Sequence, residues 1–367
     1  MDRTQSYHRK VGCLRKILRQ QRAKMVRLHT QRAISWLTGI RGVVNIATTD
    51  ACAQVWVTET SVTLKSNNIE SLRLLEEELR GIPVLLDEYP WYQSYKFGEE
   101  RTEAVLTEDD ISSELFYLQS VLDAWEWNML NELVEDTSAC VEQVGLDVKK
   151  GESELEIGAK IARLMYEREI EPIVLLVGAD ERALKRRHPL PTTRCVEQYV
   201  LISVCGRRHG LVASVTRAVH FGALPDWLRR SHIISSTVNV RAMKASKNGA
   251  SLGSIFSEIQ RTYSEFYEGD EWKKHHQGGL TGYAPRTRLA TPLDNTVLYE
   301  GMAVAWNPTI AGAKSEAIGL VGVDQGYAIG MSQEKNWPTL KIEIDGCKAN
   351  RPDILTRQVM FSMGGWM

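Results

Sequence analysis

Two apolar runs, residues 199–205 and 211–219, are separated only by a short polar segment that begins and ends with glycine. Apolar runs of this length, rich in valine, isoleucine and leucine, are typical of buried strands. Because the connection is so short, the two strands must lie side by side. The sequence therefore predicts a buried β-hairpin, and a turn with two prolines at residues 188–192 precedes it.

The region before the hairpin predicts a small α/β domain of its own. Apolar residues on one side of a helix mark the first 35 residues: Val11, Leu14, Leu18, Met25 and Leu28. Short alternating runs predict strands at 34–39, 53–58, 62–64 and 84–86, with a helix at 69–79. An acidic stretch, residues 99–110, has no periodic apolar pattern and marks the end of this domain.

The region around and after the hairpin predicts a larger second domain. We expect helices at 111–122, at 124–144, from a cap at Ser153, at 226–245 and at 251–267, and strands at 173–178, 296–306 and 317–323. With 367 residues, the chain is long enough for two separate cores. We place a first domain at residues 1–122, a second at 123–345 and a C-terminal tail at 346–367.

Composition excludes several classes of protein. A net charge of -1 argues against a general nucleic-acid binder, which needs a basic excess to meet phosphates. The six cysteines have no regular spacing, which suits reduced thiols better than a disulfide framework. No apolar run approaches the ~20 residues of a membrane span, and the N-terminus is charged. We therefore expect a cytoplasmic protein with neither membrane nor nucleic-acid partners.

Three motifs follow the hairpin: HHQGGLTGY at 275–283, WNP at 306–308 and KSE at 314–316. A lone histidine is usually a hydrogen-bonded structural residue. Two adjacent histidines beside two glycines favour a binding site instead, because glycine lets a ligand approach the backbone. Arg286 lies just after the first motif, and its planar guanidinium suits a carboxylate; a solvated surface position is the alternative.

These motifs and their spacing resemble the pita-bread family of prolidases, aminopeptidases P, methionine aminopeptidases and creatinases. The resemblance extends over about residues 10–345, and residues 36–39 (WLTG) are similar to a turn in the N-terminal domain of creatinases and prolidases. It implies an α+β protein: an N-terminal creatinase/prolidase-like α/β domain, then a pita-bread domain with a curved antiparallel sheet backed by helices.

The resemblance also implies which positions would hold metal ions. Metal-dependent members use two aspartates eleven residues apart on the hairpin, a histidine and two glutamates. The matching positions here are Ser203, Ser214, His276, Asn307 and Glu316. Only the histidine and the last glutamate could still ligate a metal, and divalent cations need carboxylates to offset their dehydration. We therefore expect no two-metal site and no cofactor.

His188 could still support catalysis despite these replacements. The resemblance implies a position near the scissile bond, and in creatinase, which works without metal, the matching histidine transfers protons. An imidazole titrates near neutral pH and can serve as general acid or base. We predict a catalytic set of His188, His276 and Glu316. The predicted substrate-binding residues are Ser203, Ser214, Asn307, Tyr283 and Arg286.

Three functions agree with the sequence. The first is a metal-independent hydrolase or lyase acting on a C–N bond of a small polar molecule or short peptide that carries a carboxylate. The second is an Xaa-Pro metallopeptidase with a degenerate metal site, and the third is a non-catalytic binding protein on the same scaffold. We also expect a homodimer, because creatinase-type relatives are commonly dimers and Trp36, Trp56 and Trp91 are of the type enriched at interfaces.

Overall fold

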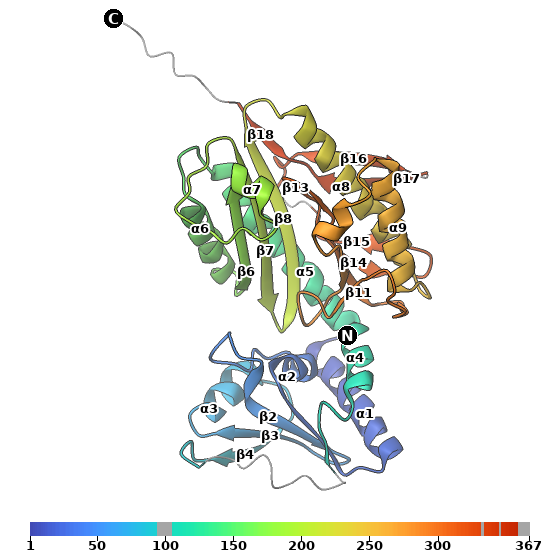
Figure 1. Cartoon of the computed structure of the whole chain (residues 1–367). Helices are drawn as coiled ribbons and strands as arrows, with labels where there is room; N and C mark the ends of the chain where they lie inside the picture. The colour runs from blue at the N-terminus through green and yellow to red at the C-terminus, as the bar shows by residue number, and fades with distance from the viewer. Residues whose placement is uncertain (94–104, 332–333, 345, 359–367) are drawn as a thin grey trace, which may run out of the picture. The chain divides into compact units, whose positions relative to one another are not determined.

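The computed structural model describes residues 1–93, 105–331, 334–344 and 346–358. The chain forms two compact units, Met1–Met129 with Arg208–Leu211, and Leu130–Arg207 with Val212–Met367 (Figure 1). The boundary expected between residues 122 and 123 lies just before the long helix α5 (Ala124–Asp147), whereas the compact units divide within it. The first half of the acidic stretch at 99–110 lies outside the described residues.

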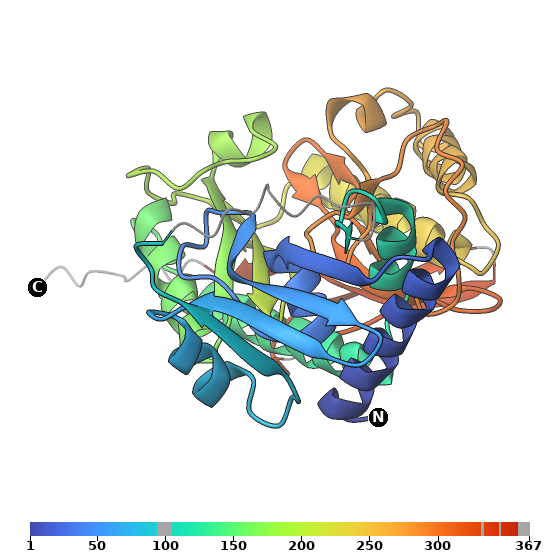
Figure 2. The same ribbon diagram turned by 90° about the horizontal axis from the view of Figure 1, so that it is seen from below.

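The first unit is built on one mixed sheet with the strand order β4-β3-β2-β1-β5. Its strands are β1 (Met25–Thr30), β2 (Asp50–Thr58), β3 (Val62–Asn67), β4 (Leu85–Tyr89) and β5 (Val105–Leu106). Its helical segments are α1 (Arg3–Gln21), α2 (Gln31–Thr38), α3 (Ser71–Arg73), η1 (Leu74–Glu78) and α4 (Ser112–Ser120). Helices α1 and α2 both contact β1 and β2, and Figure 2 shows α1 beside the strands.

Two predictions for this unit were wrong. The run at 34–39 is not a strand but the end of α2, because the Thr30 hydroxyl caps the helix by accepting from the amide of Ala33. Gly39 then ends it at a φ of +74°. The first helix also stops early, at Gln21, so that Met25 and Leu28 belong to β1. The other strands and helices predicted up to residue 93 are confirmed.

The second unit contains two larger sheets, with the orders β18-β8-β7-β6 and β10-β9-β11-β14-β15. The first comprises β6 (Glu171–Ala179), β7 (Tyr199–Arg208), β8 (Leu211–Phe221) and β18 (Leu355–Arg357). The second comprises β9 (Gly278–Leu280), β10 (Arg288–Leu289), β11 (Ala303–Trp306), β14 (Ala317–Val321) and β15 (Gly326–Ala328). Two strand pairs complete the set: β12 (Thr309–Ile310) with β13 (Ala313–Lys314), and β16 (Thr339–Ile344) with β17 (Cys347–Pro352).

Helices back these sheets: α5, α6 (Glu154–Tyr166), α7 (Glu181–Lys185), α8 (Asp226–Ala245), α9 (Leu252–Glu265) and the short η2 (Glu271–Lys274). Helix α8 contacts α9, β11, β12, β13 and β15 (Figure 1). The predicted hairpin is confirmed as β7 and β8, and β8 is buried along its whole length. The predicted fold class, α+β with antiparallel sheets backed by helices, is likewise confirmed.

Two expectations for the second unit need correction. Of the strand expected at 296–306, only Ala303–Trp306 is extended in the sheet. The expected tail after residue 345 contains β17 and β18, and β18 pairs in parallel with β8, so it completes the hairpin sheet. Within the described part of the chain, no helix has the length and apolar character needed to cross a membrane.

Candidate active site

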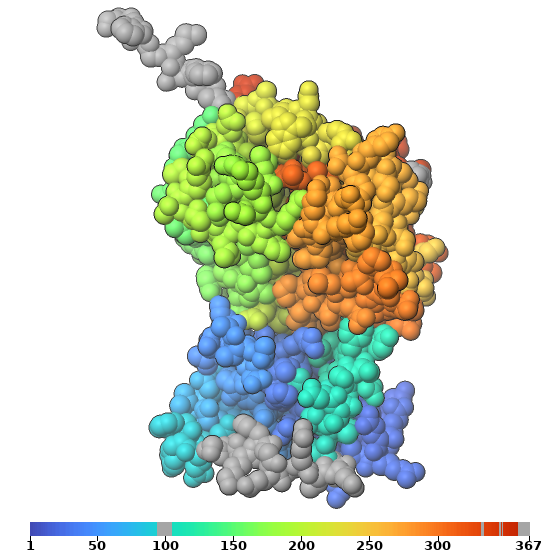
Figure 3. Space-filling view, in the orientation of Figure 1, coloured from blue at the N-terminus to red at the C-terminus, as the bar shows by residue number. Residues whose placement is uncertain are grey.

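The candidate site gathers side chains from five parts of the second unit. The hairpin contributes Ser203 from β7 and Ser214 and Thr216 from β8. Lys314 ends β13, and Glu316 lies between β13 and β14. The segment before β9 carries His275 and His276, the segment before β10 carries Arg286, and His188 lies between α7 and β7. On the face in Figure 3, the green residues before β7 and the orange residues after α9 lie side by side.

Glu316 is the centre of a buried hydrogen-bond network. Its Oε2 accepts from the Thr216 hydroxyl at 2.6 Å and from the Ser203 hydroxyl at 3.3 Å. Lys314 Nζ lies 3.2 Å from the same oxygen and donates to Ser203 Oγ at 2.7 Å. Arg286 donates to Oε1 at 3.2 Å. Both oxygens of this carboxylate are therefore occupied by donors from the protein itself.

The electrostatics of Glu316 follow from these contacts. Burial alone would raise the pKa of its carboxyl group. The charges of Lys314 and Arg286 and the hydrogen bond from Thr216 outweigh burial, and they lower the pKa to about 2. Glu316 is therefore an anion throughout the physiological range, and at neutral pH it has no proton to donate.

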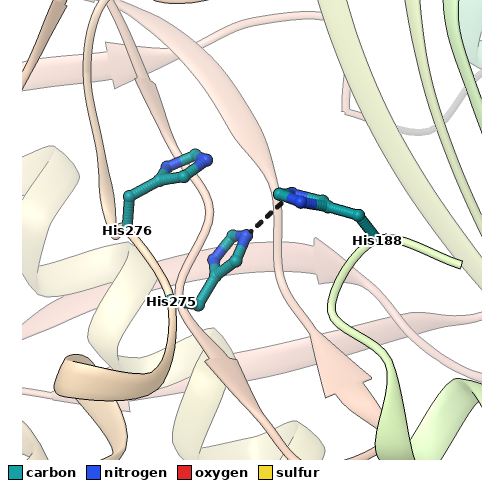
Figure 4. A group of neighbouring side chains, drawn as sticks. All are labelled: His188, His275 and His276. Atoms are coloured by element: carbon teal, nitrogen blue, oxygen red, sulfur yellow. Dashed lines mark hydrogen bonds between the residues drawn. The ribbon is translucent and has the colours of Figure 1, made fainter.

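Three histidines form a second cluster (Figure 4). His188 Nε2 and His275 Nε2 are 3.1 Å apart, so one of the two carries the shared proton. The rings of His275 and His276 are stacked, with their centroids 4.3 Å apart. One ring nitrogen from each histidine lies within 4.8 Å of the others, a spacing at which three imidazoles could ligate a metal ion.

Burial and neighbouring cations keep these imidazoles neutral. Burial is the main cause that lowers the pKa of His275 to about 3 and of His276 to about 4. Burial, followed by the charge of Lys314, also lowers the pKa of His188, whose side chain is nevertheless exposed. Lys314 acts on all three rings and Arg286 on His276, so the two clusters share one electrostatic environment.

Only some of the predicted substrate-binding residues contact the network around Glu316. Ser203 and Arg286 contact Glu316, and Ser214 contacts Arg286 and the thiol of Cys205. Asn307 is buried, and its Oδ1 has no hydrogen-bond partner. Tyr283 is also buried.

Three residues of the site were not among the predicted set: Lys314, Thr216 and His275. Lys314 stands two positions before Glu316, the spacing at which extended backbone presents two side chains on the same face. Thr216 stands two positions after Ser214 on β8 for the same reason. Both could therefore have been found from strand periodicity. The sequence showed His275 as a neighbour of His276 but not its contact with His188.

Comparison with known proteins identifies the family of this chain. The profile of metallopeptidase family M24 matches residues 129–335, which span the hairpin and all three later motifs. The chain belongs to this family. No curated protein sequence gives a significant match.

Solved structures share the fold over most of the chain. A prolidase from Pyrococcus horikoshii superposes with a TM-score of 0.73 at 16% identity, covering 89% of this chain and 99% of its own. An Xaa-Pro dipeptidase from Bacillus anthracis gives 0.72 at 14% identity, with 96% and 100% covered. An X-Pro aminopeptidase from Thermotoga maritima gives 0.71 at 14% identity, with 88% and 97% covered. At such identities the likeness establishes the fold.

Proposed function

We propose that this chain is a hydrolase that cleaves a C–N bond in a small polar substrate or short peptide without a metal ion, using His188 as general acid and base. The observation that carries the proposal is the pairing of Glu316 with two cations of the protein. Lys314 lies 3.2 Å from one carboxylate oxygen, and Arg286 lies 3.2 Å from the other.

The donor set does not fit the two-metal centre that the resemblance to metal-dependent members of this family implies. Ser203 and Ser214 offer neutral hydroxyls, which bind divalent ions much less well than carboxylates do. Both oxygens of Glu316 are engaged by cations that would have to leave before a metal ion entered. The positive charges that lower the histidine pKa values also repel any cation near those rings. The step below therefore uses the side chains of the protein alone.

His188 has the properties of a proton-transfer group. Its side chain is exposed, so a substrate can reach it, and its lowered pKa leaves the ring neutral at pH 7. A neutral imidazole can take a proton from water while the water oxygen attacks the carbon of the C–N bond. The resulting imidazolium then returns the proton to the leaving nitrogen as the bond breaks. The contact with His275 orients the ring for both transfers.

The ionised Glu316 has a different part in this proposal. Because its pKa is about 2, it acts as a counter-ion that fixes Lys314 and Arg286, not as a proton donor. Its two hydroxyl partners, Ser203 and Thr216, are themselves 2.6 Å apart and hold the carboxylate in place. This assignment keeps His188 and His276 in the predicted catalytic set and changes the role of the glutamate within it.

The test is an assay of the purified chain with Xaa-Pro dipeptides and guanidino acids, in the presence of excess chelator or of added Mn²⁺ or Co²⁺. We expect release of a free amine that chelator leaves unchanged, and metal analysis showing far less than one equivalent per chain. Activity that appears only with added metal would instead establish a metallopeptidase with a degenerate site. If neither condition gives turnover of any compound, the fold serves as a binding protein.

A further inference from the structure

We propose that Lys314 and Arg286 form a binding site for a monoanion, a carboxylate, beside Glu316. The proposal deepens the proposed function, and it rests on that function only in treating the bound anion as part of the substrate. The site itself is defined by charge and by hydrogen-bond donors on residues of β13, the segment before β10 and the hairpin. It assigns to Lys314 a role that the sequence motifs did not indicate.

The charge count leaves this network one positive charge in excess. Lys314 and Arg286 contribute two positive charges, and Glu316 contributes one negative charge. The remaining contacts of these three side chains are hydroxyls and a backbone carbonyl: Ser203, Ser214, Thr216 and the carbonyl of Pro285. All three charged side chains are at most 11% exposed. An excess charge held away from water is stabilised by an anion that enters beside it.

Hydrogen-bond donors are also in excess. Arg286 Nε is buried and has no hydrogen-bond partner. Lys314 has three ammonium hydrogens, and its contacts to Ser203 and Glu316 engage two of them. Buried donors without partners are rare in folded proteins, so two of them beside an uncompensated charge indicate an acceptor that arrives with a ligand.

The chemistry of these donors selects a carboxylate. A guanidinium and an ammonium together donate to both oxygens of a planar carboxylate, and charge-assisted hydrogen bonds of this kind are the strong ones. One negative charge brings the network to neutrality, whereas a dianion would leave an excess negative charge. The charge of Lys314 acts on the exposed His188 ring, so a carboxylate bound at Lys314 would share the electrostatic environment of that ring.

The experiment measures binding of acetate, a monoanion that is not hydrolysed, against acetamide, its neutral analogue of similar shape. Full-length protein is titrated at fixed ionic strength and pH 7, with NMR signals of the His188, His275 and His276 rings reporting the site. We expect acetate to bind and to shift these signals, and acetamide to leave them unchanged.

Variants that change the net charge of the same residues predict in which direction the acetate affinity should change. Lys314→Met brings the network to neutrality and should weaken acetate binding about tenfold or more, whereas Glu316→Gln raises the excess to two and should tighten it by a similar factor. The double variant Lys314→Met with Glu316→Gln has the original excess and should bind acetate about as the unchanged protein does. Lys273→Met removes an exposed lysine of the same unit and serves as the control.

Every outcome decides the proposal. Acetate affinity that follows net charge in this order supports it. Equal binding of acetate and acetamide, or affinity that ignores the series, overturns it. If either single variant fails to fold, the double variant and the comparison with acetamide still decide. Acetate binding without turnover of any substrate would contradict the proposed function but support the anion site. Turnover together with acetate binding that does not depend on charge would contradict the anion site alone.

Discussion

Two buried carboxylates, Glu126 in the first unit and Glu316 in the second, are each paired with a lysine, but their surroundings differ. Glu126 Oε1 lies 2.8 Å from Lys10 Nζ, and both side chains are almost completely buried. Lys10 also donates to the carbonyl of Trp36, and its ammonium lies 5.4 Å from the ring centroid of Trp125. A backbone carbonyl and aromatic rings contact this lysine, and Arg9 Nη2 lies 3.8 Å from the second oxygen of Glu126. Glu316 is surrounded by hydroxyls, by a second cation and by the histidine cluster.

The two carboxyl groups therefore respond differently to burial. Burial raises the pKa of Glu126 and lowers that of Lys10, so the interior opposes both charges of the pair. At Glu316 the donors outweigh burial, and the pKa falls to about 2. A buried ion pair is therefore weak evidence of function on its own. The hydroxyls that donate to Glu316 and the exposed imidazole that its charge acts on distinguish the second pair from the first.

Removing each carboxylate should show the difference most strongly. We expect Glu316→Gln to destabilise the second unit by about 3–5 kcal/mol, the usual effect of leaving buried charge uncompensated. Glu126→Gln should cost the first unit less, because Lys10, whose pKa is already lowered, can lose its proton, whereas Arg286 cannot. Hydrogen exchange of peptides from β2 and β8, read in urea at pH 7, reports the two units separately.

Matched variants check this interpretation. Lys10→Met combined with Glu126→Leu should recover the stability of the first unit, since apolar replacement of a buried pair is commonly neutral or stabilising. Glu181→Gln, which breaks an exposed pair with Lys185, should give no measurable change. Equal losses from Glu126→Gln and Glu316→Gln would mean that the two sites do not differ in the way proposed.

His188→Ala separates chemistry from packing within the second unit. General acid–base groups typically supply 10²- to 10⁴-fold in rate, so we expect a loss of that size in turnover of the substrate found. The melting temperature should hardly change, because the ring is exposed. His8→Ala, at an exposed position in α1, is the control. A loss below about tenfold, together with a lower melting temperature, would make His188 a structural residue.

The stability of the second unit should depend on pH in two overlapping windows. The folded pKa values of His275 and His276 lie below 6.5, so the unfolded chain binds more protons there, and stability is lost as pH falls from about 6.5 to 3. The slope should not exceed about 1.4 kcal/mol per pH unit for each ring, because each ring binds at most one proton. Stability from Glu316, whose ordinary pKa is 4.5, is lost between about pH 4.5 and 2.

Urea midpoints measured from pH 7 to 3 check this prediction. Replacing His275 and His276 together by Gln should flatten the upper window and leave the lower one in place. A flat profile between pH 6.5 and 4 in the unchanged protein would show that the two rings are not held neutral by their surroundings.

The sequence predicted most of the fold because strand and helix periods dominate this chain. The hairpin, α5, α8 and α9 all come from apolar patterns long enough to be unambiguous. The short run at 34–39 fits a strand or a helix equally well, and only the cap at Thr30 decides between them. The contribution of β18 to the hairpin sheet is a long-range pairing that local patterns do not contain.

The candidate site was predicted only in part, for a related reason. Ser203, Glu316 and His188 stand in motifs, so their positions could be read along the chain. The cations that hold Glu316 come from two segments, and which of them reaches the carboxylate depends on how the strands pack. Lys314 was not predicted, although its two-residue spacing from Glu316 could have indicated it. The contact between His188 and His275 joins residues far apart in sequence and required the structure.

The smallest effect of a substitution is expected in the first unit. We predict that this unit forms the interface of a homodimer. Light scattering should give twice the chain mass of 41.5 kDa.

Of the three tryptophans expected at an interface, Trp36 is fully buried and Trp56 lies under the ammonium of Lys65. Only Trp91 of these three, which is 63% exposed, is open to a partner. Trp91→Ala should weaken the dimer about tenfold, or about 1.4 kcal/mol. Tyr267→Ala, at the most exposed aromatic residue among those described in the second unit, should leave the dimer unchanged. A mass of 41.5 kDa at micromolar concentration would refute the dimer. An equal effect of the two substitutions on the dimer would show that Trp91 does not lie in its interface.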